Sequence, residues 1–317
     1  MQAFRKQELL MGNRFELSVV ADDEYWANEQ VTLAINEIKR IEAKLSTYKE
    51  DSETNLINRL AGIEPVQVSD ETFQLIERSI RISSITQGAF DITYGSLDKS
   101  LWNFDRNMKA LPSAETAKQM IRLINYKNIL LDKANKTVFL KEKGMRIGFG
   151  GIGKGYAAQM AKSLLIKNGV TSGVVNASGD LATWGFQPDG KKWTIGIAHP
   201  DVAKLPFSYL EISDMAVATS GNYEKFVLID GKKYSHTIDP KTGLPITGIK
   251  SVTVISPNAE ISDALATPVT IMGIEKGLYL IDQLTGVECI VIDDDNKLYT
   301  SKNIKLKENV SQRHRER

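Results

Sequence analysis

The chain has 317 residues, of which 42% are hydrophobic and 25% are charged, and its formal net charge is +1. This length allows a sizeable buried core, and the balanced charge lacks the basic excess typical of nucleic-acid-binding proteins. Three histidines and a single cysteine, Cys289, argue against a His/Cys zinc site and exclude an internal disulfide. Any bound metal is therefore expected to be a hard cation with oxygen ligands.

The ends of the sequence carry no targeting signal that we can identify. No stretch approaches the roughly 18 apolar residues expected of a membrane span, and the first eight residues lack the apolar core of a signal peptide. The short basic stretch 312–317 is expected to be a frayed tail. As written, the sequence predicts a cytoplasmic protein without a transmembrane segment; a chain trimmed of its leader would look the same.

The first half of the chain predicts helices separated by polar or irregular segments. Apolar residues recur at helical spacing in two windows, the second of which Ser69 or Asp70 could cap. The predicted elements are, in chain order, a strand over 15–20, a helix over 24–45, a polar loop-rich stretch over 46–65, a helix over 71–86, an irregular aromatic stretch over 88–104, and a strand hairpin over 128–132 and 137–140.

The second half is richer in strands. Its predicted elements are a glycine-rich stretch over 148–155, a helix to 167, strands over 173–176, 193–197, 209–212, 226–229 and 252–256, a helix that starts at 262, a helix over 274–284 and a strand over 287–292. Helices and strands mix without regular β–α–β alternation, which favours an α+β fold. We expect one domain over 1–317, with a core over 10–305 and possible division into two lobes that share a cleft.

The glycine-rich segment Gly148-Phe149-Gly150-Gly151-Ile152-Gly153-Lys154-Gly155 is a candidate anion site. Glycines let the backbone approach a ligand and present its N–H groups, and the start of the following helix favours phosphate. Lys154 stands where its ammonium could reach a phosphate oxygen. The spacing matches neither a P-loop nor a dinucleotide fingerprint. A tight turn with a solvated lysine is the alternative interpretation.

Asp263 and Thr267 are four positions apart on a predicted helix, so their oxygens share one face. A carboxylate and a hydroxyl suit Mg²⁺, which takes few protein ligands and completes its shell with water and substrate phosphates. The alternative is structural: Asp263 is a first-turn helix charge and Thr267 bonds its own backbone. Pro268 removes one helical hydrogen bond at this point and could bend the helix.

His236 lies where a predicted strand runs into a turn signalled by Asp239-Pro240 and Gly243. A histidine in this position could act as a general base near neutral pH. A structural histidine bonded to a backbone carbonyl is the alternative.

Taken together and in this order, these segments resemble the ApbE family of FAD:protein FMN transferases. The resemblance covers nearly the whole chain. It rests on the segments Met11-Gly12-Asn13-Arg14-Phe15, Leu45-Ser46-Thr47-Tyr48, Asn55-Leu56-Ile57-Asn58-Arg59-Leu60, Gly88-Ala89-Phe90-Asp91-Ile92-Thr93 with Leu101-Trp102, the glycine-rich segment, Val175-Asn176-Ala177-Ser178-Gly179-Asp180, Ala218-Thr219-Ser220-Gly221-Asn222-Tyr223, the histidine turn, and the helix with Asp263 and Thr267.

The resemblance implies an α+β fold around an FAD cleft, with Mg²⁺ at the pyrophosphate. It implies that Asp263, Thr267 and a backbone carbonyl near Gly151 hold the metal. The FMN half of FAD would move to a Thr or Ser of an acceptor protein, with release of AMP, and His236, Lys154 and Asp263 would be the catalytic residues. The residues expected to contact FAD are Tyr48, Phe90, Asp91, Gly150, Gly151, Lys154, Asn176, Asp180, Ser220, Tyr223 and His236.

Several of these assignments have alternatives. The aromatic residues Tyr48, Phe90 and Tyr223 could equally belong to the core, and Asn176 and Asp180 could simply hold a turn. An FAD pyrophosphatase, which forms FMN and AMP, would use the same site. A non-catalytic flavin carrier is a further alternative, although it would not need a metal at the pyrophosphate.

The sequence also departs from the family pattern. Many relatives have an acidic residue where this chain has Gly148, and alanine is common in place of Gly153. Pro268 replaces a better helix former. Relatives are often periplasmic and lipid-anchored and begin with a leader, which this sequence lacks.

Overall fold

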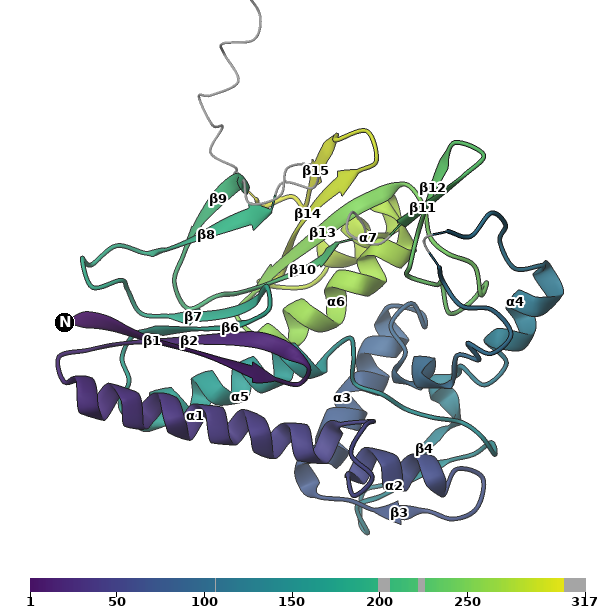
Figure 1. Ribbon diagram of the computed structural model, residues 1–317, viewed down its shortest axis with the longest axis horizontal. Helices are drawn as coiled ribbons and strands as arrows, with labels where there is room; N and C mark the ends of the chain where they lie inside the picture. The colour runs from purple at the N-terminus through teal and green to yellow at the C-terminus, as the bar shows by residue number, and fades with distance from the viewer. Residues whose placement is uncertain (106, 199–205, 222–225, 305–317) are drawn as a thin grey trace, which may run out of the picture.

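A computed structural model of the chain describes residues 1–105, 107–198, 206–221 and 226–304 (Figure 1). The basic stretch 312–317 lies outside these residues. The fold mixes helices with antiparallel sheets, which confirms the predicted α+β class. None of the helices in the described ranges combines the length and the apolarity that a membrane span requires.

One antiparallel sheet of eight strands forms the frame of the molecule, in the order β1-β2-β6-β7-β10-β13-β14-β15. The strands are β1 Gln2–Leu10, β2 Asn13–Ala21, β6 Gly173–Ala177, β7 Asp180–Trp184, β10 Ala216–Gly221, β13 Ile249–Ser256, β14 Glu288–Asp293 and β15 Leu298–Thr300. Neighbours in the sheet are far apart in sequence at β2–β6 and β7–β10. The sheet therefore brings the N-terminal hairpin beside strands from the second half of the chain.

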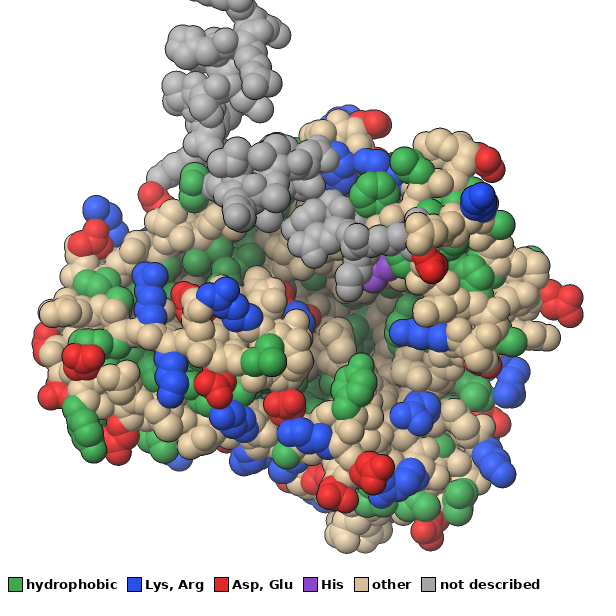
Figure 2. Space-filling view, viewed as in Figure 1, with side chains coloured by type: hydrophobic (Ala, Val, Ile, Leu, Met, Phe, Trp, Pro, Cys, Tyr) green, Lys and Arg blue, Asp and Glu red, His purple; other side chains and the backbone are tan. Residues whose placement is uncertain are grey.

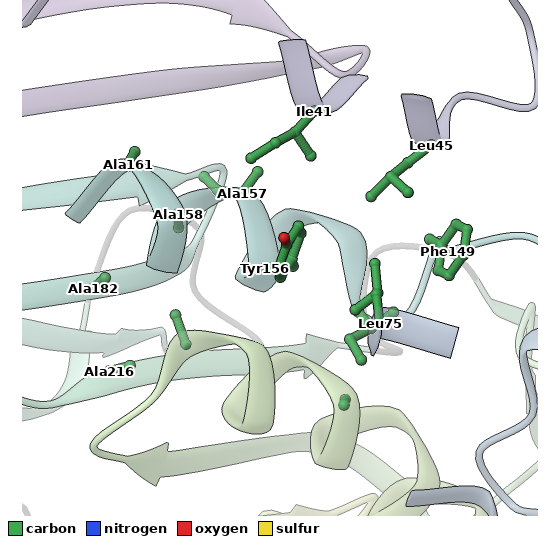
Figure 3. Packing of buried hydrophobic residues seen from close by; sticks show 14 of the residues in the cluster. Ile41, Leu45, Leu75, Phe149, Tyr156, Ala157, Ala158, Ala161, Ala182 and Ala216 are labelled. Carbon is green, nitrogen blue, oxygen red and sulfur yellow. The ribbon is translucent and has the colours of Figure 1, made fainter. Parts of the chain in front are cut away.

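Helices cover one face of this sheet: α1 (Glu24–Leu45), α5 (Gly153–Lys167), α6 (Ala259–Met272) and α7 (Ile274–Ile281) (Figure 1). The buried side of α5 contains several small residues, including Ala157, Ala158 and Ala161 (Figure 3). Small side chains let a helix lie close to its neighbours without leaving voids. As a result α5 packs between the sheet, α1 and α6.

The other face of the sheet carries a two-stranded ribbon, β8 (Trp193–Ala198) and β9 (Pro206–Ile212). A separate apolar cluster joins ribbon and sheet: Ile197, Ile212, Val217, Ile255 and Ile290. Because both faces are covered, β13 is buried along its whole length. Cys289 is fully buried in β14, within the apolar run 289–292.

Residues 46–150 form a smaller set of elements beside the end of α1 (Figure 1). They are α2 (Glu53–Arg59), β3 (Val66–Gln67), α3 (Asp70–Ile85), the 3-10 turns Ile92–Ser96 and Tyr126–Asn128, α4 (Ala114–Met120), β4 (Ile129–Asp132) and β5 (Thr137–Leu140). The short strands pair in the order β3-β5-β4. Figure 2 shows a hollow in the surface between this part and the helix-covered sheet.

Most long elements lie where the sequence predicts them, and the predicted start of one helix is wrong. The loop-rich stretch 46–65 also contains the short helix α2, which starts where the Ser52 hydroxyl accepts from the Asn55 N–H. Helix α6 starts at Ala259 and not at Ser262, because the Asn258 side chain caps it. Asp263 therefore lies in the second turn of α6. Pro268 is accommodated within the helix, which continues to Met272.

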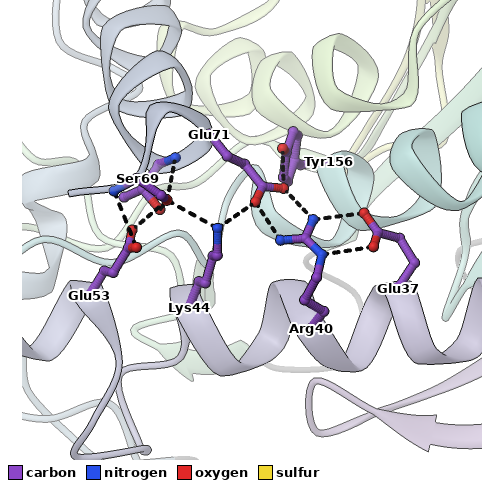
Figure 4. A network of polar contacts seen from close by, with 8 residues as sticks. Glu37, Arg40, Lys44, Glu53, Ser69, Glu71 and Tyr156 are labelled. Carbon is purple, nitrogen blue, oxygen red and sulfur yellow. Dashed lines mark hydrogen bonds and ion pairs between the residues drawn. The ribbon is translucent and has the colours of Figure 1, made fainter. Parts of the chain in front are cut away.

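A polar network ties the helices together (Figure 4). The Glu71 carboxylate of α3 accepts hydrogen bonds from Arg40 and Lys44 of α1, and from the Tyr156 hydroxyl of α5 at 2.8 Å. The Arg40 hydrogen bonds are the main reason that the pKa of Glu71 falls to about 2. A carboxylate with a lowered pKa stabilises the folded state above its ordinary pKa, and this stabilisation is lost as the pH falls towards 2.

We predict that Glu71→Gln lowers the free energy of unfolding at pH 7 by about 1 kcal/mol, since partly exposed ion pairs are screened by solvent. The difference from the unsubstituted protein should shrink as the pH falls from about 4.5 towards 2. Urea unfolding at pH 7, 4 and 3 measures it. Glu77→Gln, on the same helix but paired with solvent-exposed partners, is the control and should have a smaller effect. A pH-independent difference for Glu71→Gln would contradict the argument.

Candidate functional site

The site begins where the glycine-rich segment enters α5. The N-cap residue Ile152 offers no side-chain acceptor to the first N–H groups of the helix. The Asp263 carboxylate of α6 is the acceptor instead. Asp263 Oδ2 accepts from the Gly155 N–H at 2.8 Å, and the Lys154 N–H also donates to this carboxylate. A carboxylate is stabilised at a helix N-terminus by these N–H groups and by the helix dipole.

Gly155 allows this contact because it has no side chain. A Cβ at this position would lie 2.2 Å from the Ala259 carbonyl oxygen and 2.5 Å from the Asp263 Cβ, so no other residue fits without moving a helix. The Ala259 N–H also donates to the Gln159 side chain at 3.0 Å, a second link between the two helices. The crossing of α5 and α6 at Gly155 therefore fixes where Asp263 lies.

Lys154 does not point into solvent. Its ammonium pairs with the carboxylate of Asp180, the first residue of β7. Asp180 is buried and also accepts from the Thr219 N–H of β10. The glycine-rich turn, the β6–β7 hairpin, β10 and α6 thus meet at one cluster of two carboxylates and one ammonium.

The electrostatics of this cluster follow from burial. Burial and the nearby charge of Asp180 raise the pKa of Asp263 to about 7. Burial also raises the pKa of Asp180, against the opposing effect of Lys154. For Lys154, burial acts to lower the pKa, but the charges of Asp263 and Asp180 outweigh it and raise the pKa. When both carboxylates are ionised, they leave one net negative charge beside the Lys154 ammonium, which a bound cation would neutralise.

The donor set suits a hard cation that takes only part of its ligands from the protein. Thr267 follows Asp263 by one helical turn and is partly exposed, and Gly151 is partly exposed in the turn. Within the described ranges no group of three or more His, Cys, Asp or Glu side chains is placed to hold a metal. Carboxylate, hydroxyl and backbone oxygens, completed by water and phosphate, are the ligands that Mg²⁺ commonly takes.

The aromatic candidates have different environments. Phe90 is buried, and its ring edge would lie 3.6 Å from a Cβ on Gly151, so it lies against the glycine-rich turn. Tyr48 is 96% exposed, which excludes the alternative that it belongs to the core. Gly150 is exposed, with open space around its Cα. Tyr223 lies outside the described residues.

Two polar candidates have clear structural roles. The Asp91 carboxylate accepts from the N–H and hydroxyl of Thr93 and from the Tyr126 N–H, and it holds a buried turn. The Asn176 side chain accepts from the Gly179 N–H and closes the β6–β7 hairpin. Neither observation tests a contact with FAD, which remains a prediction for both residues. Ser220, near the end of β10, pairs with Val252 of β13 and is partly exposed.

The histidine turn is held in place by packing. His236 is exposed, and its ring meets the edge of Phe104 with centroids 6.3 Å apart. Two residues on, Ile238 packs with Leu97 and Met120 in a small apolar cluster. A Cβ on Gly243 would lie 2.3 Å from the Ala117 carbonyl oxygen, so the turn also lies directly against α4. His236 is therefore presented from an anchored turn.

Sequence reasoning found Lys154, Asp180 and Asp263 but not how they are joined. It also missed the packing role of Gly155. The partners are 26 residues apart for Lys154 and Asp180, and 108 residues apart for Gly155 and Asp263. No local pattern signals contacts over such separations.

The profile of the ApbE family matches residues 11–291. The chain belongs to the ApbE family. Its relatives include a protein of Klebsiella pneumoniae (strain 342) named FAD:protein FMN transferase, which is 32% identical over 92% of this chain and 90% of that protein. A Treponema pallidum (strain Nichols) protein of the same name is 30% identical over 84% of this chain and 78% of its own length.

Solved ApbE structures share the fold. The Thermotoga maritima ApbE protein superposes with a TM-score of 0.84 at 30% identity, covering 95% of this chain and 97% of its own. The Pseudomonas stutzeri flavinyl transferase ApbE, in its apo form, gives a TM-score of 0.83 at 28% identity and covers 95% of both chains. These matches confirm the ApbE resemblance that the ordered motifs indicate.

The crossing at Gly155 can be tested with two neighbouring glycines. We predict that Gly155→Ala destabilises the protein by about 2–3 kcal/mol, because the new methyl group overpacks the α5–α6 contact. Gly153→Ala is the matched control: its Cβ would lie 3.4 Å from the Phe149 Cβ and 3.5 Å from Met11 Cε, which is ordinary contact. Alanine should be neutral or slightly stabilising there. Equal unfolding midpoints for the two variants in urea would refute the steric argument.

Proposed function

We propose that this ApbE-family chain is a Mg²⁺-dependent FAD:protein FMN transferase, which attaches FMN to a Thr or Ser of an acceptor protein and releases AMP. The proposal rests on one observation, the cluster of Asp263, Lys154 and Asp180 at the N-terminus of α5. Relatives of this chain at about 30% identity carry the name FAD:protein FMN transferase. A reaction at a pyrophosphate needs positioned charge of this kind more than covalent chemistry from the protein.

In the proposed reaction the acceptor hydroxyl attacks the phosphorus on the riboflavin side of FAD. A new O–P bond forms, the bond from this phosphorus to the bridging oxygen breaks, and AMP leaves with that oxygen. Bound Mg²⁺ would neutralise charge on the pyrophosphate oxygens. We propose that Asp263, Thr267 and the Gly151 carbonyl hold it.

The protein groups have separate roles in this proposal. Lys154, released in part from Asp180 when phosphate enters, would face negative phosphate oxygens. The N–H groups of Lys154 and Gly155 bond Asp263, and those of Ile152 and Gly153 bond the Phe149 carbonyl, so only N–H groups earlier in the turn would face phosphate. His236 would take the proton of the acceptor hydroxyl, because an imidazole presented from an anchored turn can act as a general base. The remaining candidates would contact FAD; they are Tyr48, Phe90, Asp91, Gly150, Asn176, Asp180, Ser220 and Tyr223.

The first test mixes the protein with FAD, Mg²⁺ and a protein that carries a candidate threonine acceptor motif. We predict a covalent FMN adduct, seen as a mass gain of the acceptor and as in-gel flavin fluorescence. Asp263→Ala should reduce the adduct by at least about 100-fold, because it removes charge that the bound metal and phosphates require. Asp189→Ala, at an exposed turn, is the control and should retain transfer.

The other outcomes separate the alternatives. Release of AMP without an adduct would point to an FAD pyrophosphatase. Intact FAD that stays bound in the presence of Mg²⁺ would point to a carrier.

A second prediction concerns His236. If His236 removes the proton, His236→Ala should lower the rate of transfer by about 100-fold, the lower end of the range for a general base. Initial rates of adduct formation with the unsubstituted protein and with His236→Ala measure this effect. Unchanged transfer in His236→Ala would remove the residue from the mechanism.

A further inference from the structure

Arg78 of α3 makes a pair of contacts that the proposed reaction does not use. Its guanidinium bonds both oxygens of Glu260, with Nε to Oε1 at 2.6 Å and Nη2 to Oε2 at 3.0 Å. Glu260 is 4% exposed and lies in the first turn of α6. Such two-point pairing fixes orientation as well as distance.

The same guanidinium also lies against α5. Its central carbon is 5.7 Å from the centre of the Tyr156 ring, within the range of a cation–π contact. The Tyr156 hydroxyl returns to α3 through its 2.8 Å bond to Glu71 (Figure 4). Helix α3 therefore holds α5 and α6 through one arginine.

The positions that Arg78 holds are next to the site. Tyr156 directly follows Gly155, whose N–H donates to Asp263. Glu260 precedes Asp263 by three residues and so lies on the neighbouring turn of the same helix. A shift of either helix by less than 1 Å would change the Gly155–Asp263 contact, because a hydrogen bond of 2.8 Å weakens steeply with distance and angle.

We propose that Arg78 is a positioning residue for the metal site: through Glu260 and Tyr156 it sets the crossing of α5 and α6 and so the placement of the Asp263 carboxylate. The proposal rests on the proposed function, in which Asp263 is a ligand of Mg²⁺. Groups that orient the ligands of a metal typically change its affinity by about 10–100-fold when they are replaced. Arg78 itself touches neither metal nor substrate in this scheme.

The competing explanation is that the pair only stabilises the fold. Removing Arg78 would leave the buried Glu260 carboxylate without its partner, which is destabilising in itself, so a lower unfolding midpoint does not distinguish the two explanations. The affinity for a metal does, because a structural pair has no reason to change it in molecules that remain folded.

The experiment measures Mn²⁺ binding to the full chain from the loss of the free-ion EPR signal, without FAD, so that the readout does not depend on activity. The variants are Arg78→Lys, which keeps the charge but loses the two-point contact, and Arg78→Met. Arg81→Met is the matched control on the same helix, since Arg81 is exposed and pairs only within α3 among the contacts described. Circular dichroism and thermal unfolding show which variants are folded at the assay temperature.

We expect Arg78→Lys to weaken Mn²⁺ binding by about tenfold and Arg78→Met by more, with Arg81→Met unchanged. If Arg78→Met does not fold, Arg78→Lys decides. Mn²⁺ affinity equal to that of the unsubstituted protein in a folded Arg78 variant would overturn the proposal and leave a structural ion pair. If neither the unsubstituted protein nor Asp263→Ala binds Mn²⁺, the metal site of the proposed function is refuted. This inference is then refuted as well, because it rests on that site.

Discussion

The contact between α5 and α6 at Gly155 is the constraint on which the site depends. Because Gly155 has no side chain, α5 and α6 can pack in direct contact. This contact brings the Asp263 carboxylate to the first N–H groups of α5. The helix gains an acceptor that its own N-cap residue lacks. The same contact places a carboxylate beside the glycine-rich turn, where the proposed function puts the pyrophosphate of FAD.

The rest of the fold supports this contact from several directions. The alanine-lined face of α5 lets the helix lie close to the sheet, and β7 and β10 bring Asp180 and the Thr219 N–H to Lys154 (Figure 3). Helix α3, from the segment 46–150, contacts α5 through Glu71 and α6 through Arg78. The site is thus built from segments of the whole chain, which agrees with a family match that spans residues 11–291.

The structural role of Asp263 leaves room for the metal-binding role that we propose for it. Asp263 caps a helix with Oδ2, and a carboxylate has a second oxygen and further lone pairs for a cation. Burial beside Asp180 makes the charged form of Asp263 costly, which raises its pKa, and a cation at this point would offset that cost. The structural and metal-binding interpretations of Asp263 are therefore compatible.

The long amphipathic helices, the α+β class and, through the order of the motifs, the family follow from the sequence alone. Periodicity and motif spacing are read directly from the chain, so they need no knowledge of the fold. The capping of α6 by Asn258, the pairing of Lys154 with Asp180 and the role of Gly155 in helix packing do not follow from the sequence. They emerge from the folded chain, because each depends on a partner distant in sequence or on a competing local cap. The packing role of a glycine in particular cannot be recognised until the atoms that fill the space of a side chain at that position are known.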